Sequence, residues 1–128
     1  YRVRRPANPN EISALYRIFR TEEFRTIAGR EASDHLIVTD ETDRVIGGLI
    51  YRRMSESYVR LEWIVVGHMR RGRGIGAALL VEFLERLRAH GVRAVSTGFF
   101  RPAFFAKFGF GVDPRYPGIV KILEPVAE

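Results

Sequence analysis

A glycine-rich loop between an apolar segment and a helical pattern constrains the fold of this chain more than any other feature. Residues 63–66 are apolar, and the loop after them carries Gly72, Gly74 and Gly76 at alternate positions. Glycines at the start of a helix let the backbone approach a ligand, and the first N–H groups of a helix have no partner within it. Because these donors lie at the positive end of the helix dipole, the loop predicts a site for a diphosphate.

The glycines fit a plain tight turn or a magnesium-nucleotide loop less well. A tight turn without a ligand accounts for one or two of them, but not for three at alternate positions beside Arg71 and Arg73. A magnesium-nucleotide loop of the Walker type needs Lys and then Ser or Thr after its last glycine. Here Gly76 is followed by Ala77 and Ala78. The loop therefore does not match that type.

A dinucleotide-binding turn fits the spacing but not the surroundings. Gly72, Gly74 and Ala77 match the pattern G-x-G-x-x-A. Such a turn follows its strand directly, and an acidic residue lies at the end of the next strand, about 20 residues later. In this chain residues 67–71 intervene, and residues 96–98 at the end of the next predicted strand are Ser, Thr and Gly. These differences disfavour a dinucleotide.

Hydrophobic periodicity predicts alternating strands and helices. Apolar residues at helical spacing indicate helices, and runs of β-branched and aromatic residues indicate strands. The early strands form hairpins, whereas the strands on either side of a helix over 77–90 are expected to be parallel. We therefore expect an α/β fold with a mixed sheet. The predicted strands are residues 1–7, 35–40, 44–54, 57–66, 92–98, 110–115 and 118–125, and the predicted helices are residues 8–24, 77–90 and 101–108.

Composition limits the class of protein. With 128 residues, we expect one domain over residues 1–128. No apolar run reaches the roughly 18 residues that span a bilayer, so we expect no membrane partner. The chain has no cysteine, which excludes disulfides and fits a reducing, cytoplasmic location. Its histidines, His35, His68 and His90, do not have metal-ligand spacing, so we expect no metal.

Two motifs together resemble a known family. Residues 63–80 resemble the acetyl-CoA signature of the GNAT superfamily of N-acetyltransferases, an apolar strand followed by Arg/Gln-x-x-Gly-x-Gly/Ala, with Arg71, Gly74 and Gly76 at the motif positions. Residues 104–110 resemble the late signature of the same superfamily. The resemblance covers essentially the whole chain. It implies a mixed, mostly antiparallel twisted sheet with a splayed central parallel strand pair and helices on both faces.

The resemblance also implies acetyl-CoA as the acetyl donor and a primary amine as the acceptor, which attacks the thioester directly. The backbone of Ile64, Val65 and Val66 would pair with the pantetheine arm like an added strand. The N–H groups of residues 71–77 would hold the pyrophosphate. The residues of this stretch are Arg71, Gly72, Arg73, Gly74, Ile75, Gly76 and Ala77.

Glu62 is the candidate catalytic base. It precedes Ile64 by two residues, so strand alternation places both side chains on one face of the sheet. Acting directly or through water, its carboxylate would take a proton from the ammonium form of the acceptor. The alternative is an exposed strand carboxylate paired with Arg60 or Arg52.

The chain departs from the family pattern in two places. Phe105 stands where the family often has a tyrosine that protonates the leaving thiolate, and Gly98 stands where it has an asparagine. The proton would then come from Tyr116, Ser96, His68 or water, or the thiolate would leave unprotonated. A second function therefore stays open, which is a non-catalytic acyl-CoA-binding regulatory domain of a longer protein.

The acceptor is marked only weakly. The net charge of +6 favours an anionic partner, but no motif matches a reader of RNA or DNA, so we expect no nucleic acid. Arg52, Arg53 and Arg101 could hold a carboxylate or form a solvated surface. Four phenylalanines, at positions 99, 100, 104 and 105, could form an apolar wall or pack in the core. We expect a small-molecule or peptide amine and leave open whether the protein is a homodimer.

Overall fold

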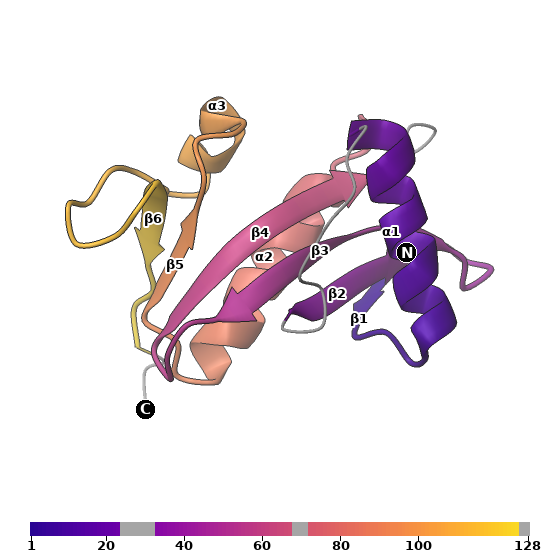
Figure 1. Cartoon of the computed structure of the whole chain (residues 1–128), viewed down its shortest axis with the longest axis horizontal. Coiled ribbons are helices and arrows are strands. Elements are labelled where there is room, and N and C mark those ends of the chain that lie inside the picture. The colour runs from indigo at the N-terminus through magenta and orange to yellow at the C-terminus, as the bar shows by residue number, and fades with distance from the viewer. Residues whose placement is uncertain (24–32, 68–71, 126–128) are drawn as a thin grey trace.

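The strands of the sheet lie side by side in the order in which they occur along the chain. The computed structural model describes residues 1–23, 33–67 and 72–125, and within these residues one six-stranded sheet is flanked by helices (Figure 1). The elements are β1 (Arg2–Arg4), α1 (Pro9–Glu23), β2 (Asp34–Thr39), β3 (Val45–Arg53), β4 (Tyr58–Val66), α2 (Ile75–Ala89), β5 (Ala94–Thr97), α3 (Pro102–Ala106) and β6 (Ile119–Ile122).

The β4–β5 pair is parallel, whereas the other neighbouring strands pair antiparallel. The parallel pairing runs only from Tyr58 with Ala94 to Leu61 with Thr97. Beyond this point β4 continues to Val66 while β5 has ended, and the two strands diverge in Figure 1. The predicted mixed sheet with a splayed parallel pair is therefore confirmed.

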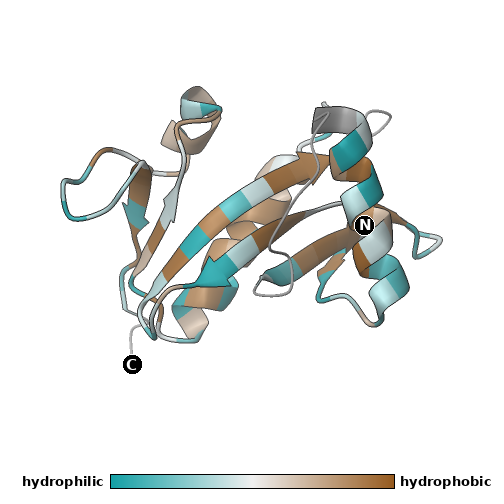
Figure 2. Ribbon diagram, viewed as in Figure 1, coloured by the Kyte–Doolittle hydropathy of each residue, from teal (hydrophilic) through white to brown (hydrophobic). Residues whose placement is uncertain are grey.

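The two faces of the sheet carry separate apolar clusters. On one face α2 packs through Leu79, Leu80 and Phe83 against residues that include Leu61 and Ile64. On the other face α1 packs through Leu15 and Phe19 against Ile37, Ile50 and Val65. Figure 2 shows the matching hydrophobic bands along the central strands. The predicted placement of helices on both faces is confirmed.

A glycine allows α1 to pack closely on the sheet. A Cβ atom added to Gly48 of β3 would lie 2.8 Å from Leu15 Cδ1 and 2.5 Å from the Leu36 carbonyl oxygen. A side chain at this position would therefore push the helix or the neighbouring strand away.

At the start of α1, the Asn8 side chain accepts a hydrogen bond of 3.0 Å from the Glu11 N–H, as expected for an N-cap residue. None of the described helices has the length and apolar character needed to cross a membrane.

The second helix begins earlier than the sequence pattern predicts. The apolar pattern predicts a start at Ala77, but α2 starts at Ile75 with Gly74 as its N-cap residue. The reason is that Gly74 adopts φ 73° and places the next residue directly in the helix, so Gly76 belongs to the first turn. The predicted end is confirmed, because Gly91 has φ 85° and Val92 N–H donates to the Leu87 carbonyl at 3.0 Å.

The strand predicted over residues 110–115 is wrong. Only Gly111 forms a bridge, with Val120 on β6. The chain then turns, because the Asp113 carboxylate accepts hydrogen bonds from the backbone and the side chain of Arg115. Alternation of apolar residues did not reveal this turn, since a local side-chain bond competes with strand pairing.

Candidate functional site

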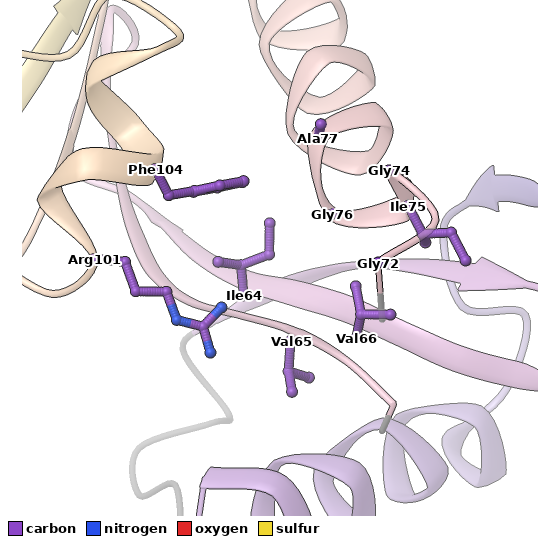
Figure 3. Close-up of a pocket in the computed structure, with 10 residues that line it drawn as sticks. All are labelled: Ile64, Val65, Val66, Gly72, Gly74, Ile75, Gly76, Ala77, Arg101 and Phe104. Carbon is purple, nitrogen blue, oxygen red and sulfur yellow. The ribbon is translucent and has the colours of Figure 1, made fainter. Parts of the chain in front are cut away.

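A cavity of about 320 Å³ lies where the end of β4, the start of α2 and α3 meet. Figure 3 shows Arg101 and Phe104 on one side of it, the start of α2 on the other, and Ile64 of β4 between them. It therefore opens into the space created by the divergence of β4 and β5. The lining residues are Ile64, Val65, Val66, Gly72, Gly74, Ile75, Gly76, Ala77, Arg101 and Phe104.

The turn before α2 depends on glycine because of its backbone conformation. Gly72 and Gly74 have φ values of 80° and 73°, in the left-handed region that other residues rarely adopt. A Cβ atom at either position would meet no atom within 4 Å, so space for a side chain is not what selects glycine here. The turn is also open toward the cavity.

The start of α2 is arranged to receive negative charge. Gly74 provides no side-chain cap, and the first turn of the helix contains no acidic residue. Among the described residues, the first N–H groups of the helix therefore have neither a side-chain cap nor a competing carboxylate in the first turn, and they lie at the positive end of the helix dipole. Across the cavity, Arg101 contributes a cationic side chain.

One edge of β4 faces this cavity. On its other edge β4 pairs with β3, for example Ile64 with Leu49 and Val65 with Gly48. The pairing with β5 ends at Leu61, so the described residues provide no strand partner for Ile64 and Val65 on that side. An extended ligand could hydrogen-bond to such an edge as an added strand does.

Comparison with known proteins identifies the family of the chain. Residues 4–110 match the sequence profile of the Acetyltransferase (GNAT) family. The chain belongs to the GNAT acetyltransferase family. No match was found among curated proteins.

Solved GNAT structures share the fold. YhbS from Escherichia coli, a GNAT family N-acetyltransferase in complex with CoA, is 21% identical, with coverage of 96% of this chain and 81% of that chain and a TM-score of 0.76. An aminoglycoside 6'-N-acetyltransferase complexed with coenzyme A is 15% identical over 100% of both chains, with a TM-score of 0.75. A GNAT acetyltransferase from Elizabethkingia anophelis with acetyl-CoA bound is 14% identical over 96% of this chain and 97% of that chain, with a TM-score of 0.72.

Most residues that the sequence assigned to the acyl donor meet at the cavity of this GNAT chain. The backbone residues Ile64, Val65 and Val66 and the loop residues Gly72, Gly74, Ile75, Gly76 and Ala77 all line it. Arg73 is exposed and does not line the cavity. Arg71 lies outside the described residues. The motif identified neither Arg101 nor Phe104 as a cavity residue, because both come from α3 and the turn before it.

Glu62 lies in a β-bulge beside the splay. Ile50 pairs with Trp63 and Tyr51 pairs with Leu61, so Glu62 is an extra residue of β4 with no Cα partner on β3. Leu61 and Ile64 belong to the same apolar cluster, so strict alternation fails here. The expectation that alternation places Glu62 and Ile64 on one face of the sheet is therefore wrong. A bulge bends a strand and increases its twist, and this one coincides with the point where β4 leaves β5.

The structure contains one of the ion pairs considered for Glu62. Its Oε1 lies 3.6 Å from Arg52 Nε, and its side chain is 27% exposed. Glu62 is absent from the residues that line the cavity. A base must reach the amine from outside the acyl-donor cavity, and the partly exposed carboxylate beside the splay is compatible with this. Its catalytic role remains a prediction.

Phe105 is part of the core in this GNAT chain. Its side chain is 0% exposed, and its ring lies 5.1 to 5.4 Å from those of Phe104, Phe110 and Phe100. Two of the alternative proton donors lie beside Tyr58, because Ser96 Oγ is 2.6 Å from the Tyr58 hydroxyl and the Tyr116 ring centroid is 4.9 Å from that of Tyr58 in a tilted arrangement.

The phenylalanine cluster serves both roles that the sequence left open. Phe104 lines the cavity, Phe105 is buried, and Phe99 is largely exposed.

Two remaining predictions concern a proton donor and a metal. His68 lies outside the described residues. Within the parts of the chain that the structure describes, no group of His, Asp or Glu is arranged to hold a metal.

Proposed function

We propose that this GNAT protein transfers an acetyl group from acetyl-CoA to a primary amine by direct attack. The observation that supports this most strongly is the cavity that joins the start of α2 to the edge of β4 at Ile64 and Val65. Among the described residues, no side chain caps this helix start and no strand pairs with these two residues on the cavity side. One end of this cavity suits an anion and the other suits an extended amide chain. Family membership supports the acetyltransferase activity.

We assign the acyl donor to the cavity in one orientation. The pyrophosphate would accept hydrogen bonds from the backbone N–H groups of residues 71–77, and Arg101 would add positive charge from the opposite wall. The pantetheine arm would pair with the backbone of Ile64, Val65 and Val66. Phe104 and the apolar side chains of β4 would exclude water around the thioester, which raises the strength of nearby polar interactions.

The reaction then needs few protein groups. Glu62 would accept a proton from the ammonium group, directly or through water, and give a neutral amine. The nitrogen forms a bond with the acetyl carbon, and the carbon–sulfur bond breaks with its electron pair on sulfur. The amine loses a second proton, the thiolate gains one, and one proton is released overall. We assign no dedicated acid, because Phe105 has no proton to donate and a thiolate is a good leaving group.

A titration with acetyl-CoA, followed by calorimetry, tests the donor site. Desulfo-CoA and NADH serve as comparators. We expect micromolar binding of both CoA ligands and no comparable binding of NADH, because the loop would recognise the CoA diphosphate and the β4 edge its pantetheine arm. Absence of CoA binding would contradict the proposal. Release of free thiol from acetyl-CoA in the presence of amines then tests catalysis.

The second candidate function is a regulatory domain that binds acyl-CoA without turnover. The burial of a phenylalanine at position 105 favours it, since the position offers no proton donor. Tight CoA binding without thiol release across a broad panel of amines would support this candidate over the enzyme.

The remaining assignments complete the proposal. We propose that residues 1–128 act as one GNAT domain, that the acceptor is a small-molecule or peptide amine, and that the location is cytoplasmic. The cytoplasmic assignment rests on the absence of cysteine. A homodimer stays open.

A further inference from the structure

Two arginines face each other across neighbouring strands next to the proposed reaction centre. Arg52 on β3 and Arg60 on β4 are direct Cα partners. Like charges at directly opposed positions of a sheet destabilise the pair. Arg52 Nε and Arg60 Nη1 are nevertheless both buried, and neither atom has a hydrogen-bond partner within the described part of the chain. Leaving such donors unsatisfied costs stability, so these two groups are candidates for binding the acceptor.

The local charge is not balanced. Glu62 Oε1 lies 3.6 Å from Arg52 Nε, which forms an ion pair. Among the described residues, no second carboxylate pairs with Arg52 and none pairs with Arg60. The group of Arg52, Arg60 and Glu62 therefore carries one excess positive charge. Figure 2 shows hydrophilic bands within β4, whose sequence contains Arg60 and Glu62.

The excess charge is located at the splay. Arg60 pairs with Ser96 of β5, one position before the last pair of the parallel ladder. A Cβ atom added to Gly98 would lie 3.9 Å from Arg60 Nη2. The guanidinium group therefore reaches across the first residue after β5, and the absence of a side chain at Gly98 leaves room beside it.

This charge lies on the face of the sheet opposite α2. Val59 and Leu61 belong to the apolar cluster beneath α2, and neighbouring residues of a strand point to opposite faces. The row formed by Arg52, Arg60 and Ser96 therefore lies on the other face, which α1 covers further along the sheet at Ile50 and Val65. Both arginines are partly exposed as residues, so an acceptor could reach them from the side of the splay away from α2.

We propose that Arg60, assisted by Arg52, binds a carboxylate group of the amine acceptor. The inference rests on the proposed acetyltransferase function and adds a substrate class to it, namely primary amines that carry a carboxylate. A guanidinium group forms paired hydrogen bonds with a carboxylate. Arg60 precedes Glu62 by two positions on β4, so the carboxylate would be held at one point of β4 and the amine directed toward Glu62.

The carboxylate takes no part in bond making. The acceptor nitrogen forms the bond with the acetyl carbon, the carbon–sulfur bond breaks with its electron pair on sulfur, and one proton is released overall. Arg60 is therefore a binding and positioning residue, and its loss should act on the choice of acceptor.

A matched set of acceptors tests the proposal. We would measure thiol release from acetyl-CoA with ω-amino carboxylates from glycine to 6-aminohexanoate, each compared with its amide. In the wild type, kcat/KM for at least one carboxylate should exceed that for its amide on the order of 10- to 100-fold. Arg60→Gln should bring this ratio close to one, and Arg60→Lys should restore part of it. Equal rates for carboxylates and amides in the wild type would overturn the proposal.

The control variant is Arg53→Gln. Arg53 is exposed and follows Arg52 on β3, so its loss removes the same charge without touching the Arg52–Arg60 pair. It should keep the preference for the carboxylate. If Arg53→Gln lowers the ratio as much as Arg60→Gln does, general electrostatic attraction explains the preference and the proposal fails.

Two further measurements separate the possible failures. Binding of acetyl-CoA to the wild type reports on the proposed function independently of the acceptor. If no acceptor of the set is acetylated, calorimetric titration with the same compounds decides, since binding of a carboxylate that Arg60→Gln loses supports the proposal and absence of such binding overturns it. Arg60→Gln should also unfold at the same or a higher urea concentration than the wild type. A clear decrease would indicate a structural role and contradict the inference.

Discussion

Thr97 Oγ1 donates a hydrogen bond of 3.0 Å to the carbonyl oxygen of Leu61. These two residues are also the last Cα pair of the parallel β4–β5 ladder. The Thr97 side chain is fully buried, so this bond forms away from water at the point where the strands part. It ties together the two strands immediately before they diverge.

Replacement of Thr97 by Val should therefore destabilise the protein. The variant keeps the shape of the side chain but removes the donor, and we expect a loss of about 1 kcal/mol in the free energy of unfolding. Urea unfolding followed by circular dichroism measures this loss. Thr97→Ser keeps the hydroxyl but loses the methyl group, so it is the control that measures the cost of lost packing. A Thr97→Val variant as stable as the wild type would contradict the contribution of the hydrogen bond.

Replacement of Gly74 by Asp should weaken binding of acetyl-CoA strongly. The new carboxylate would lie at the start of α2, where we place the pyrophosphate, and like charges repel. We expect a loss of about 10-fold or more in affinity relative to Gly74→Asn, a difference of at least about 1.4 kcal/mol, as measured by calorimetry.

Gly74→Asn is a close control because both residues have a similar size and both tolerate a positive φ better than other side chains do. The strain at φ 73° is thus common to the two variants. If Asn and Asp weaken binding equally, backbone strain accounts for the effect and the charge does not.

Replacement of Glu62 by Gln should lower the rate of acetyl transfer most at pH values below the pKa of the acceptor amine, where the ammonium form dominates and a base is needed. We expect the loss in kcat to lie between about 10²- and 10⁴-fold, with little change in affinity for acetyl-CoA. A pH–rate profile measures both. Since the variant also breaks the ion pair with Arg52, Arg52→Gln is the control, and an unchanged pH profile for Glu62→Gln would exclude the role of a base.

Replacement of Glu11 by Gln should change how stability depends on pH. The guanidinium of Arg4, which donates to both Glu11 oxygens at 2.8 and 2.6 Å, and the Ala7 N–H lower the pKa of Glu11 from its ordinary value of 4.5 to about 2. Because the pKa is lowered in the folded state, the stabilisation is complete above pH 4.5 and is lost as the pH falls toward 2.

The variant should therefore be less stable than the wild type by about 1 to 2 kcal/mol near neutral pH, and the difference should shrink in that acidic range. Urea unfolding at a series of pH values measures it. Glu41→Gln removes a charge from an exposed turn and should show no such trend. A difference between wild type and Glu11→Gln that is constant with pH would contradict the assignment.

Local patterns were sufficient to predict most of the elements. Helical spacing of apolar residues located α1, and Gly91 marked the end of α2, because these signals depend on neighbours within a few residues. The same holds for the turn at Gly72 and Gly74, whose positive φ values follow from what glycine alone adopts easily. The prediction of a strand at residues 110–115 was wrong because the Asp113 side chain accepts a hydrogen bond from the Arg115 N–H and stabilises a turn there.

Local sequence patterns could not predict the contacts between distant parts of the chain. Arg101 and Phe104 line the cavity together with the start of α2. The sequence marked Phe104 as part of the late signature and of a possible apolar wall, but it did not show that these residues lie opposite the glycine turn. The bulge at Glu62 depends on pairing with Ile50 and Tyr51 of another strand, so alternation within β4 could not reveal it.

The order of strands, the glycine turn and the family resemblance are properties of the chain alone, since spacing and backbone preference are encoded residue by residue. The approach of Arg60 to Arg52 and to the end of β5 at Gly98 is a property of the packed sheet. Strand register brings these residues together, and register depends on the combined burial of both faces. The physical reason is that local preference acts over a few bonds. The side chains of the site meet only when the strands have paired and the helices have packed on both faces of the sheet.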